Sequence, residues 1–166
     1  MSYYNLIFHR GVNKFCQEAI QNGAQGLIVP DMPPDEEKME GYFSACAGAG
    51  LFSIPVVSPV STTERLLKIK RVAKGFVYCT ARLGTTGAKE RLPDFLFDYL
   101  NKVKEVIGLP RAVGFGISRK DHIESLRNNA EIAVIGSALI DCYRNAKDDD
   151  KIREIQKFIR ELKEVL

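Results

Sequence analysis

Five short apolar runs recur along the 166-residue chain, and their spacing constrains the fold more than any other feature. Each run is nearly continuous in apolar residues, which is typical of strands buried on both faces of a parallel sheet. Helical patterns fill the intervals, so strand and helix alternate with a period of about 25 residues. The runs cover residues 26–29, 51–57, 76–79, 112–117 and 132–135. This alternation predicts an α/β protein.

Helix-start signals separate these runs. Residues 33–37 place proline and acidic side chains in a first turn, where exposed N–H groups favour negative charge. Residues 61–64 match a capping box, Pro93-Asp94 is expected to open a further helix, and residues 118–121 predict a cap at Ser118. Apolar residues at helical spacing over 149–166 predict an amphipathic closing helix.

Two architectures fit this pattern. A doubly wound sheet of five strands would be complete at this length, whereas a TIM barrel needs eight strands and about 250 residues. Length alone favours the doubly wound sheet. The chain shows no linker and no low-complexity tract, so residues 1–166 are expected to form a single domain.

Composition narrows the classes of function. No run of 18 apolar residues and no basic leader are present, so neither a membrane span nor a signal peptide is expected. The net charge of +3, without Lys/Arg clusters interleaved with aromatic residues, argues against nucleic acid binding. Four cysteines without C-x-x-C spacing and two isolated histidines predict reduced thiols, a cytoplasmic protein and no metal site.

Three glycine-bearing segments lie at or soon after the ends of predicted strands, at residues 86–87, 114–118 and 136–137. Glycine lets a backbone N–H approach a phosphate oxygen closely, and a helix that begins there adds the positive end of its dipole. In TIM barrels, phosphates bind the loops after the last two strands and a short extra helix. Residues 137–143 are expected to be that helix. The three segments together predict a phosphate site and favour the barrel.

Five ordered segments resemble the tryptophan synthase alpha subunit family. They are GLIVPDMPPDE (26–36), GFVYCTARLGTTGA (75–88), AVGFGIS (112–118), AVIGSALI (133–140) and the opening MSYYN (1–5), which is similar to the family's MTYYN. The resemblance implies a TIM barrel that cleaves indole-3-glycerol phosphate to indole and glyceraldehyde 3-phosphate in tryptophan biosynthesis. It also implies no cofactor of the chain's own, and a partner β subunit that binds pyridoxal phosphate and receives the indole.

The resemblance assigns roles residue by residue. Gly87, Gly116, Gly136 and Ser137 fall on phosphate-binding positions, and Tyr78, Tyr3 and Thr86 fall on the substrate pocket. The polar loop 82–89, with Arg82, Gly84 and Thr85, falls on a lid that closes over the substrate. Asn5 and Pro33 fall on loops that face the β subunit.

The sequence departs from the family in two places. Ala81 and Thr85 replace the serine and valine of the usual lid motif S-R-x-G-V-T-G. The motif at residues 1–5 ends the family's third strand, so the catalytic glutamate and aspartate would lie ahead of residue 1. The chain is therefore expected to be the C-terminal two-thirds of an alpha subunit, an incomplete barrel of about five to six strands, with no catalytic pair and no lyase activity alone.

Other interpretations remain open. A different phosphate-binding barrel enzyme would need a catalytic lysine or metal-ligating histidines on its strands, and the sequence offers neither. A non-catalytic partial barrel could bind phosphate, dock on a β subunit or pair with itself through open edges at 26–29 and 132–135. Asp31 could be a general base by position, but a carboxylate that anchors a loop is the favoured interpretation.

Overall fold

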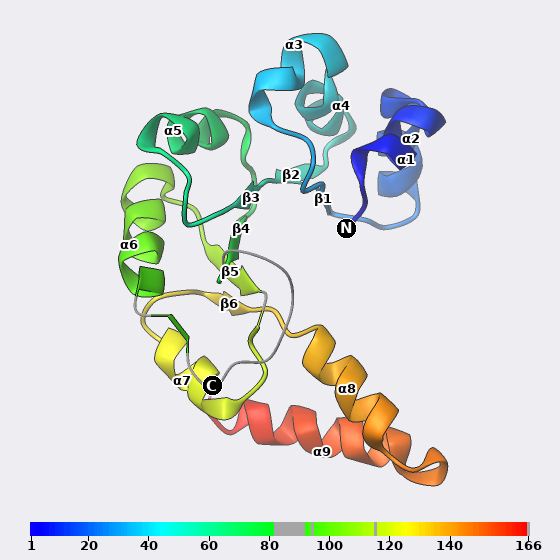
Figure 1. Cartoon of the computed structure of the whole chain (residues 1–166). Helices are drawn as coiled ribbons and strands as arrows, with labels where there is room; N and C mark the ends of the chain where they lie inside the picture. Colours follow the sequence, from blue (N-terminus) through cyan, green and yellow to red (C-terminus); the bar gives the residue numbers. More distant parts are fainter. Residues whose placement is uncertain (82–91, 94, 115, 166) are drawn as a thin grey trace.

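The structure is a computed structural model that describes residues 1–81, 92–93, 95–114 and 116–165 (Figure 1). Strands and helices alternate through these residues, as the sequence predicts. The strands are β1 (Gly26–Ile28), β2 (Phe52–Ile54), β3 (Val56–Val57), β4 (Val77–Thr80), β5 (Arg111–Gly114) and β6 (Ile132–Ala133). The helices are α1 (Tyr4–Arg10), α2 (Val12–Gln21), α3 (Glu37–Glu40), α4 (Tyr42–Ala49), α5 (Thr63–Val72), α6 (Phe95–Ile107), α7 (Lys120–Leu126), α8 (Ser137–Asn145) and α9 (Lys151–Lys163), with 3₁₀ turns at Pro34–Glu36 and Asp148–Asp150.

All described strand pairs are parallel. β1 pairs with β2, and β3, β4, β5 and β6 pair in chain order. The predicted strand at 51–57 becomes two strands because Pro55 lies between them and has no N–H for the ladder. Each of the five predicted runs therefore supplies at least one strand of a parallel array.

Several helix predictions are confirmed and two are corrected. α8 begins at Ser137 as expected, and α9 closes the described fold. The cap of α5 is Thr62 rather than Ser61, because the Thr62 hydroxyl accepts the Arg65 N–H at 3.2 Å. Ser118 does not cap α7 with its side chain; its backbone N–H donates to Nδ1 of His122 at 3.3 Å instead.

The buried residues form two clusters. The central cluster packs α5, α6, α7 and α9 against β3, β4 and β5, with Val77, Leu100 and Val113 fully buried. The N-terminal cluster packs α1, α2 and α4 around Ile7 and Cys16. All four cysteines are free thiols, as expected, and Cys142 alone of the four is partly exposed. No helix in the described ranges is both long and apolar enough to cross a membrane.

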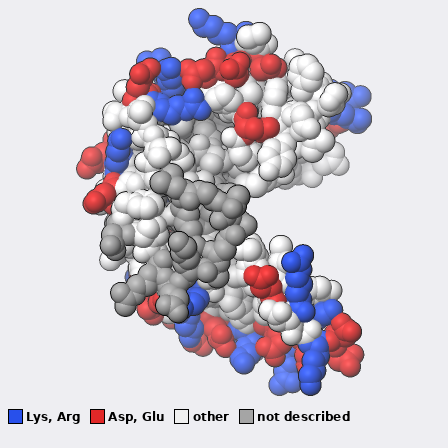
Figure 2. Space-filling view, in the orientation of Figure 1, with Lys and Arg blue, Asp and Glu red and all other residues white. Residues whose placement is uncertain are grey.

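The described strands form an open crescent, not a closed barrel. β1 and β6 lie at its two ends, and each pairs with one described strand only. Figure 2 shows a hollow between the arm that carries α1 and α2 and the arm that carries α8 and α9. With β2 and β3 counted as one kinked strand, the described array has five of the eight strands that a TIM barrel uses.

Candidate functional site

A cavity of about 440 Å³ lies against the carboxyl ends of β1, β5 and β6 and reaches Phe76 and Tyr78 at the start of β4. This is the end of parallel strands where barrels bind ligands. Four of the predicted site residues line it: Tyr78, Gly116, Gly136 and Ser137. The structure therefore brings together three predicted phosphate-binding positions and one predicted pocket residue from three different strand ends.

Tyr78 is fixed by a close approach to the neighbouring strand. It lies on β4, and a Cβ atom added to Gly114 of β5 would lie 1.9 Å from the Tyr78 hydroxyl oxygen. Only glycine at position 114 leaves room for the ring in this orientation. Burial raises the pKa of Tyr78, so the phenol stays neutral at ordinary pH and lines the cavity without adding a charge.

Backbone groups form the polar side of the cavity. Gly116 has a φ of 98°, a left-handed conformation that favours glycine. Gly136 precedes α8, and Ser137 is the first residue of that helix. The first N–H groups of a helix have no partners within the helix, and the helix dipole places partial positive charge there. None of the described side chains that line the cavity is charged. An anion would therefore have to be held by backbone N–H groups, the Ser137 hydroxyl and the helix dipole.

The cavity also has an apolar wall that was not predicted from the sequence. Five further residues line it: Met1, Ile28, Phe76, Ile117 and Val134. Strand periodicity could have indicated Phe76, because side chains two residues apart point to the same face and Tyr78 was already assigned to the pocket. The cavity thus has an apolar wall opposite its glycine-rich end, which suits a ligand with a phosphate at one end and a ring at the other.

Not all predicted residues reach the cavity. Tyr3 is 66% exposed and does not line it. Asn5 is exposed, as an interface residue should be, but it lies in the first turn of α1 and not on a loop as predicted. Pro33 lies half-buried on the loop between β1 and the following 3₁₀ turn. The predicted lid residues Arg82, Gly84 and Thr85, with Thr86 and Gly87, lie outside the described residues.

Asp31 follows β1 but is engaged in anchoring the backbone. Its two carboxylate oxygens accept the Tyr4 N–H at 3.0 and 3.1 Å, at the start of α1. The Tyr4 hydroxyl in turn donates to Glu40 at 2.6 Å. These bonds support the loop-anchoring interpretation of Asp31.

The described residues also show no metal centre. His122 is buried, with its Nδ1 accepting the Ser118 N–H, and no group of three or more potential ligands occurs in the described ranges. The histidines of this part of the chain therefore give no support to a metal-dependent barrel.

The sequence profile of the tryptophan synthase alpha chain family matches residues 1–166. The chain belongs to this family. The alpha chain of Thermoanaerobacter sp. (strain X514) is 38% identical over 167 residues, which cover 99% of this chain and 62% of that protein. The alpha chain of Thermococcus kodakarensis is 35% identical, over 98% of this chain and 63% of its own length.

Solved structures of the family agree with the fold. An alpha subunit in the tryptophan synthase α2β2 complex of Pyrococcus furiosus superposes with a TM-score of 0.86 at 33% identity, over 98% of this chain and 64% of that subunit. The parallel strands are therefore those of the family's TIM barrel, and the predicted family and fold class are confirmed. This alpha-family chain spans less than two thirds of the length of the relatives named here.

Proposed function

We propose that this chain forms the phosphate-binding part of a site that cleaves indole-3-glycerol phosphate to indole and glyceraldehyde 3-phosphate in tryptophan biosynthesis. One observation carries the proposal: Gly116, Gly136 and Ser137 meet at one cavity beside Tyr78, and no described side chain that lines it is charged. The N–H groups at these positions would hold the phosphate, with the glycine-rich loop 82–89 as the lid. Tyr78, Phe76 and Ile28 would contact the indole ring.

The reaction needs two carboxyl groups that this cavity does not contain. Cleavage of the carbon–carbon bond requires an acid that protonates the indole ring and a carboxylate that takes a hydroxyl proton from the glycerol chain. None of the described lining residues is an aspartate or glutamate, and Asp31 holds the Tyr4 backbone instead. On the family resemblance, we propose that the catalytic pair is not among the described residues, and we expect no lyase activity from this polypeptide alone.

The same chain would act beside a β subunit in the cytoplasm. The Pyrococcus furiosus alpha subunit that it resembles was solved within an α2β2 complex. Exposed Asn5 and half-buried Pro33 are the residues that we assign to the equivalent contact here. Pyridoxal phosphate would belong to the partner, and the chain would bring no cofactor of its own.

A second candidate function is non-catalytic. The strand edges at β1 and β6 each pair on one side only within the described residues, so a partial barrel could act by docking or by self-association. Release of indole from indole-3-glycerol phosphate by the purified chain would exclude this alternative and contradict the expected inactivity.

Calorimetric titration with glycerol 3-phosphate tests the site. We expect binding by the native chain and at least tenfold weaker binding by Gly116→Asp, because a carboxylate there would repel the phosphate. Gly50→Asp is the matched control: Gly50 also has a positive φ, but it lies at the end of α4 and does not line the cavity. Equal loss in both variants, or no binding by a folded native chain, would reject the assignment.

A further inference from the structure

His122 is a buried imidazole on α7 that does not line the candidate cavity. Apart from tyrosine and cysteine, it is one of three described residues with a polar or charged side chain that are buried; the others are Ser53 and Arg111. The Ser53 hydroxyl donates to the Val72 oxygen, and Arg111 pairs with Glu131. Burial of a polar side chain costs free energy unless a hydrogen bond compensates, so the partner of each such residue shows which segment it holds.

The Nδ1 atom of His122 accepts the backbone N–H of Ser118 at 3.3 Å. A backbone N–H can only donate, so Nδ1 is the unprotonated nitrogen of the ring and the proton lies on Nε2. His122 is the third residue of α7, and its side chain reaches back past the start of the helix. This resembles the returning bond of a capping box, in which the third helical residue accepts the N–H of the N-cap residue. Here the bonded N–H lies one residue earlier, before the N-cap residue Arg119.

Ser118 ends a segment that contributes two residues to the cavity. Gly116 and Ile117 both line it, and Gly116 has the left-handed φ of 98°. The bond to His122 therefore joins residues 116–118 directly to α7.

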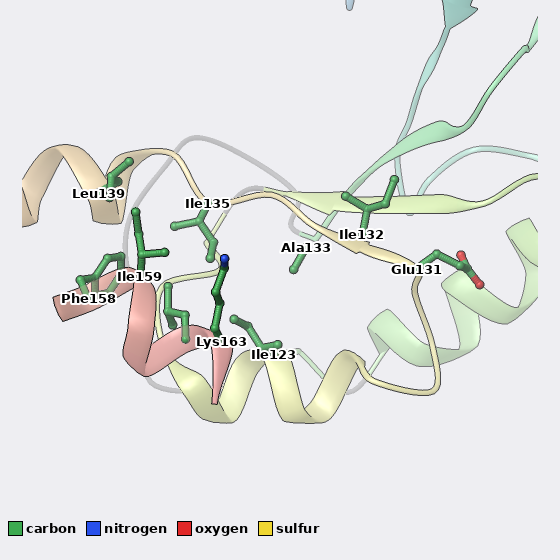
Figure 3. Close-up of a pocket in the computed structure, with 10 residues that line it drawn as sticks. Ile123, Glu131, Ile132, Ala133, Ile135, Leu139, Phe158, Ile159 and Lys163 are labelled. Atoms are coloured by element: carbon green, nitrogen blue, oxygen red, sulfur yellow. The ribbon is translucent and has the colours of Figure 1, made fainter. Parts of the chain in front are cut away.

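Helix α7 is itself held by apolar packing. Ile123, the residue after His122, is 4% exposed and Leu126 is 3% exposed, and both belong to the central cluster. Ile123 points from α7 toward a second cavity, of about 500 Å³, between β6, α7 and α9 (Figure 3). His122 thus connects a segment at the candidate site to a helix that is fixed in the core.

We infer that His122 is a positioning residue for the phosphate: by accepting the Ser118 N–H, it holds residues 116–118 in the conformation that binds the anion. The inference rests on the proposed function, in which backbone N–H groups hold the phosphate because the described lining has no charged side chain. Binding through backbone groups is strongest when those groups are ordered before the ligand arrives. Release of one residue of backbone corresponds to a loss of about tenfold in affinity.

Two variants separate the acceptor of His122 from its bulk. His122→Asn keeps an acceptor, because its Oδ1 is bonded to Cγ as Nδ1 is, but it removes part of the buried ring. His122→Leu keeps a bulky buried side chain and removes the acceptor. In calorimetric titration with glycerol 3-phosphate, His122→Leu should bind at least tenfold more weakly than the native chain, and His122→Asn should stay within about threefold of it. A residue that acted by packing alone would give the opposite order.

Ser53→Ala is the matched control. Ser53 is also buried and hydrogen-bonded, to Val72 of α5, but it does not line the cavity. This variant should change the affinity by less than about twofold, even where it lowers stability.

Hydrogen exchange of the Ser118 amide, followed by NMR in the chain without ligand, tests the bond itself. Exchange should be at least tenfold faster in His122→Leu than in the native chain, because the amide loses its partner. It should stay close to the native rate in His122→Asn. This measurement does not depend on phosphate binding.

Three outcomes would overturn the inference while the phosphate site stands: native affinity in His122→Leu, a tenfold loss of affinity in a folded His122→Asn chain, or Ser118 exchange that His122→Leu leaves unchanged. The second of these decides the matter even if His122→Leu does not fold. No binding by a native chain that is folded by circular dichroism would instead reject the proposed site, and the inference with it.

Discussion

The centre of the sheet and its two ends differ in how they are held. β4 and β5 have four residues each, pair on both sides and are almost entirely buried. β6 has two residues, neither of them fully buried, and β1 has three residues with one buried. The central strands are stabilised by packing within the chain, whereas the strands at the two ends leave part of their apolar side chains exposed. The described residues therefore combine a well-buried centre with more exposed strands at the two ends.

Truncation of a central side chain should have the largest effect. Leu100 of α6 is fully buried against the central cluster. Leu100→Ala should lower the free energy of unfolding by about 2–5 kcal/mol, because it removes buried methyl groups and leaves a cavity. Urea unfolding followed by circular dichroism measures the change. Leu67→Ala, on the exposed side of α5, should cost less than about 1 kcal/mol; equal losses would mean that the centre is not a packed core.

A change at Gly114 should disturb the centre and the candidate site together. Gly114→Ala forces the Tyr78 ring to move, because the new Cβ would overlap its hydroxyl. We expect a loss of about 1–3 kcal/mol in stability, as for an overpacked core, and weaker glycerol phosphate binding.

The double variant Gly114→Ala with Tyr78→Ala isolates this clash. Its loss of stability should be less than the sum of the two single losses, because residues in contact do not act additively. Strict additivity would show that the two residues do not meet as described.

The centre was also the part that the sequence predicted best. Continuous apolar runs such as 76–79 indicate buried parallel strands. Glycines near the ends of such runs pointed to Gly116, Gly136 and Ser137, which line one cavity, and their binding of phosphate stays a prediction. Helix α1, which contains Asn5, was not predicted, and Asn5 was expected on a loop. A seven-residue helix has little periodicity to detect. The sequence did not decide which residue caps α5, because Ser61, Thr62 and Thr63 are adjacent and each has a hydroxyl that can cap a helix. The backbone angles place Thr62 at that position.

The apolar wall of the cavity was harder to predict for a physical reason. Phe76 and Val134 look like ordinary strand residues, and only the curvature of the sheet decides that their side chains face a cavity. The Arg111–Glu131 pair was missed as well. Nothing in the sequence indicates that a charged residue at the start of a strand is buried, since Arg is seldom fully buried without a partner.

This ion pair joins the centre to the β6 end, and it predicts a pH dependence. Buried Arg111 meets Glu131 at 2.7 Å, and its backbone N–H also donates to that carboxylate. The Arg111 guanidinium holds the pKa of Glu131 below its usual value. The stabilisation is therefore fully present above a pH of about 4.5 and is lost as the pH falls through the lowered pKa.

Glu131→Gln should cost about 1–2 kcal/mol at pH 7, less than the loss of a fully buried pair, because the Glu131 side chain is 47% exposed. Native chain and variant should converge in stability on acidification. Urea unfolding at pH 7 and at pH 3.5 measures this, with Glu164→Gln, which changes an exposed carboxylate paired with Lys120, as the control. A constant difference between native chain and Glu131→Gln at both pH values would show that the carboxylate charge does not act on Arg111.

The smallest effect is expected at the β6 end. Ile132 is 39% exposed in the chain alone, so Ile132→Ala should lower the free energy of unfolding by less than about 1 kcal/mol. Urea unfolding measures the change, and Leu67→Ala, at a side chain that is 47% exposed, should show a loss of similar size. A loss as large as that of Leu100→Ala would mean that Ile132 is packed as a core residue.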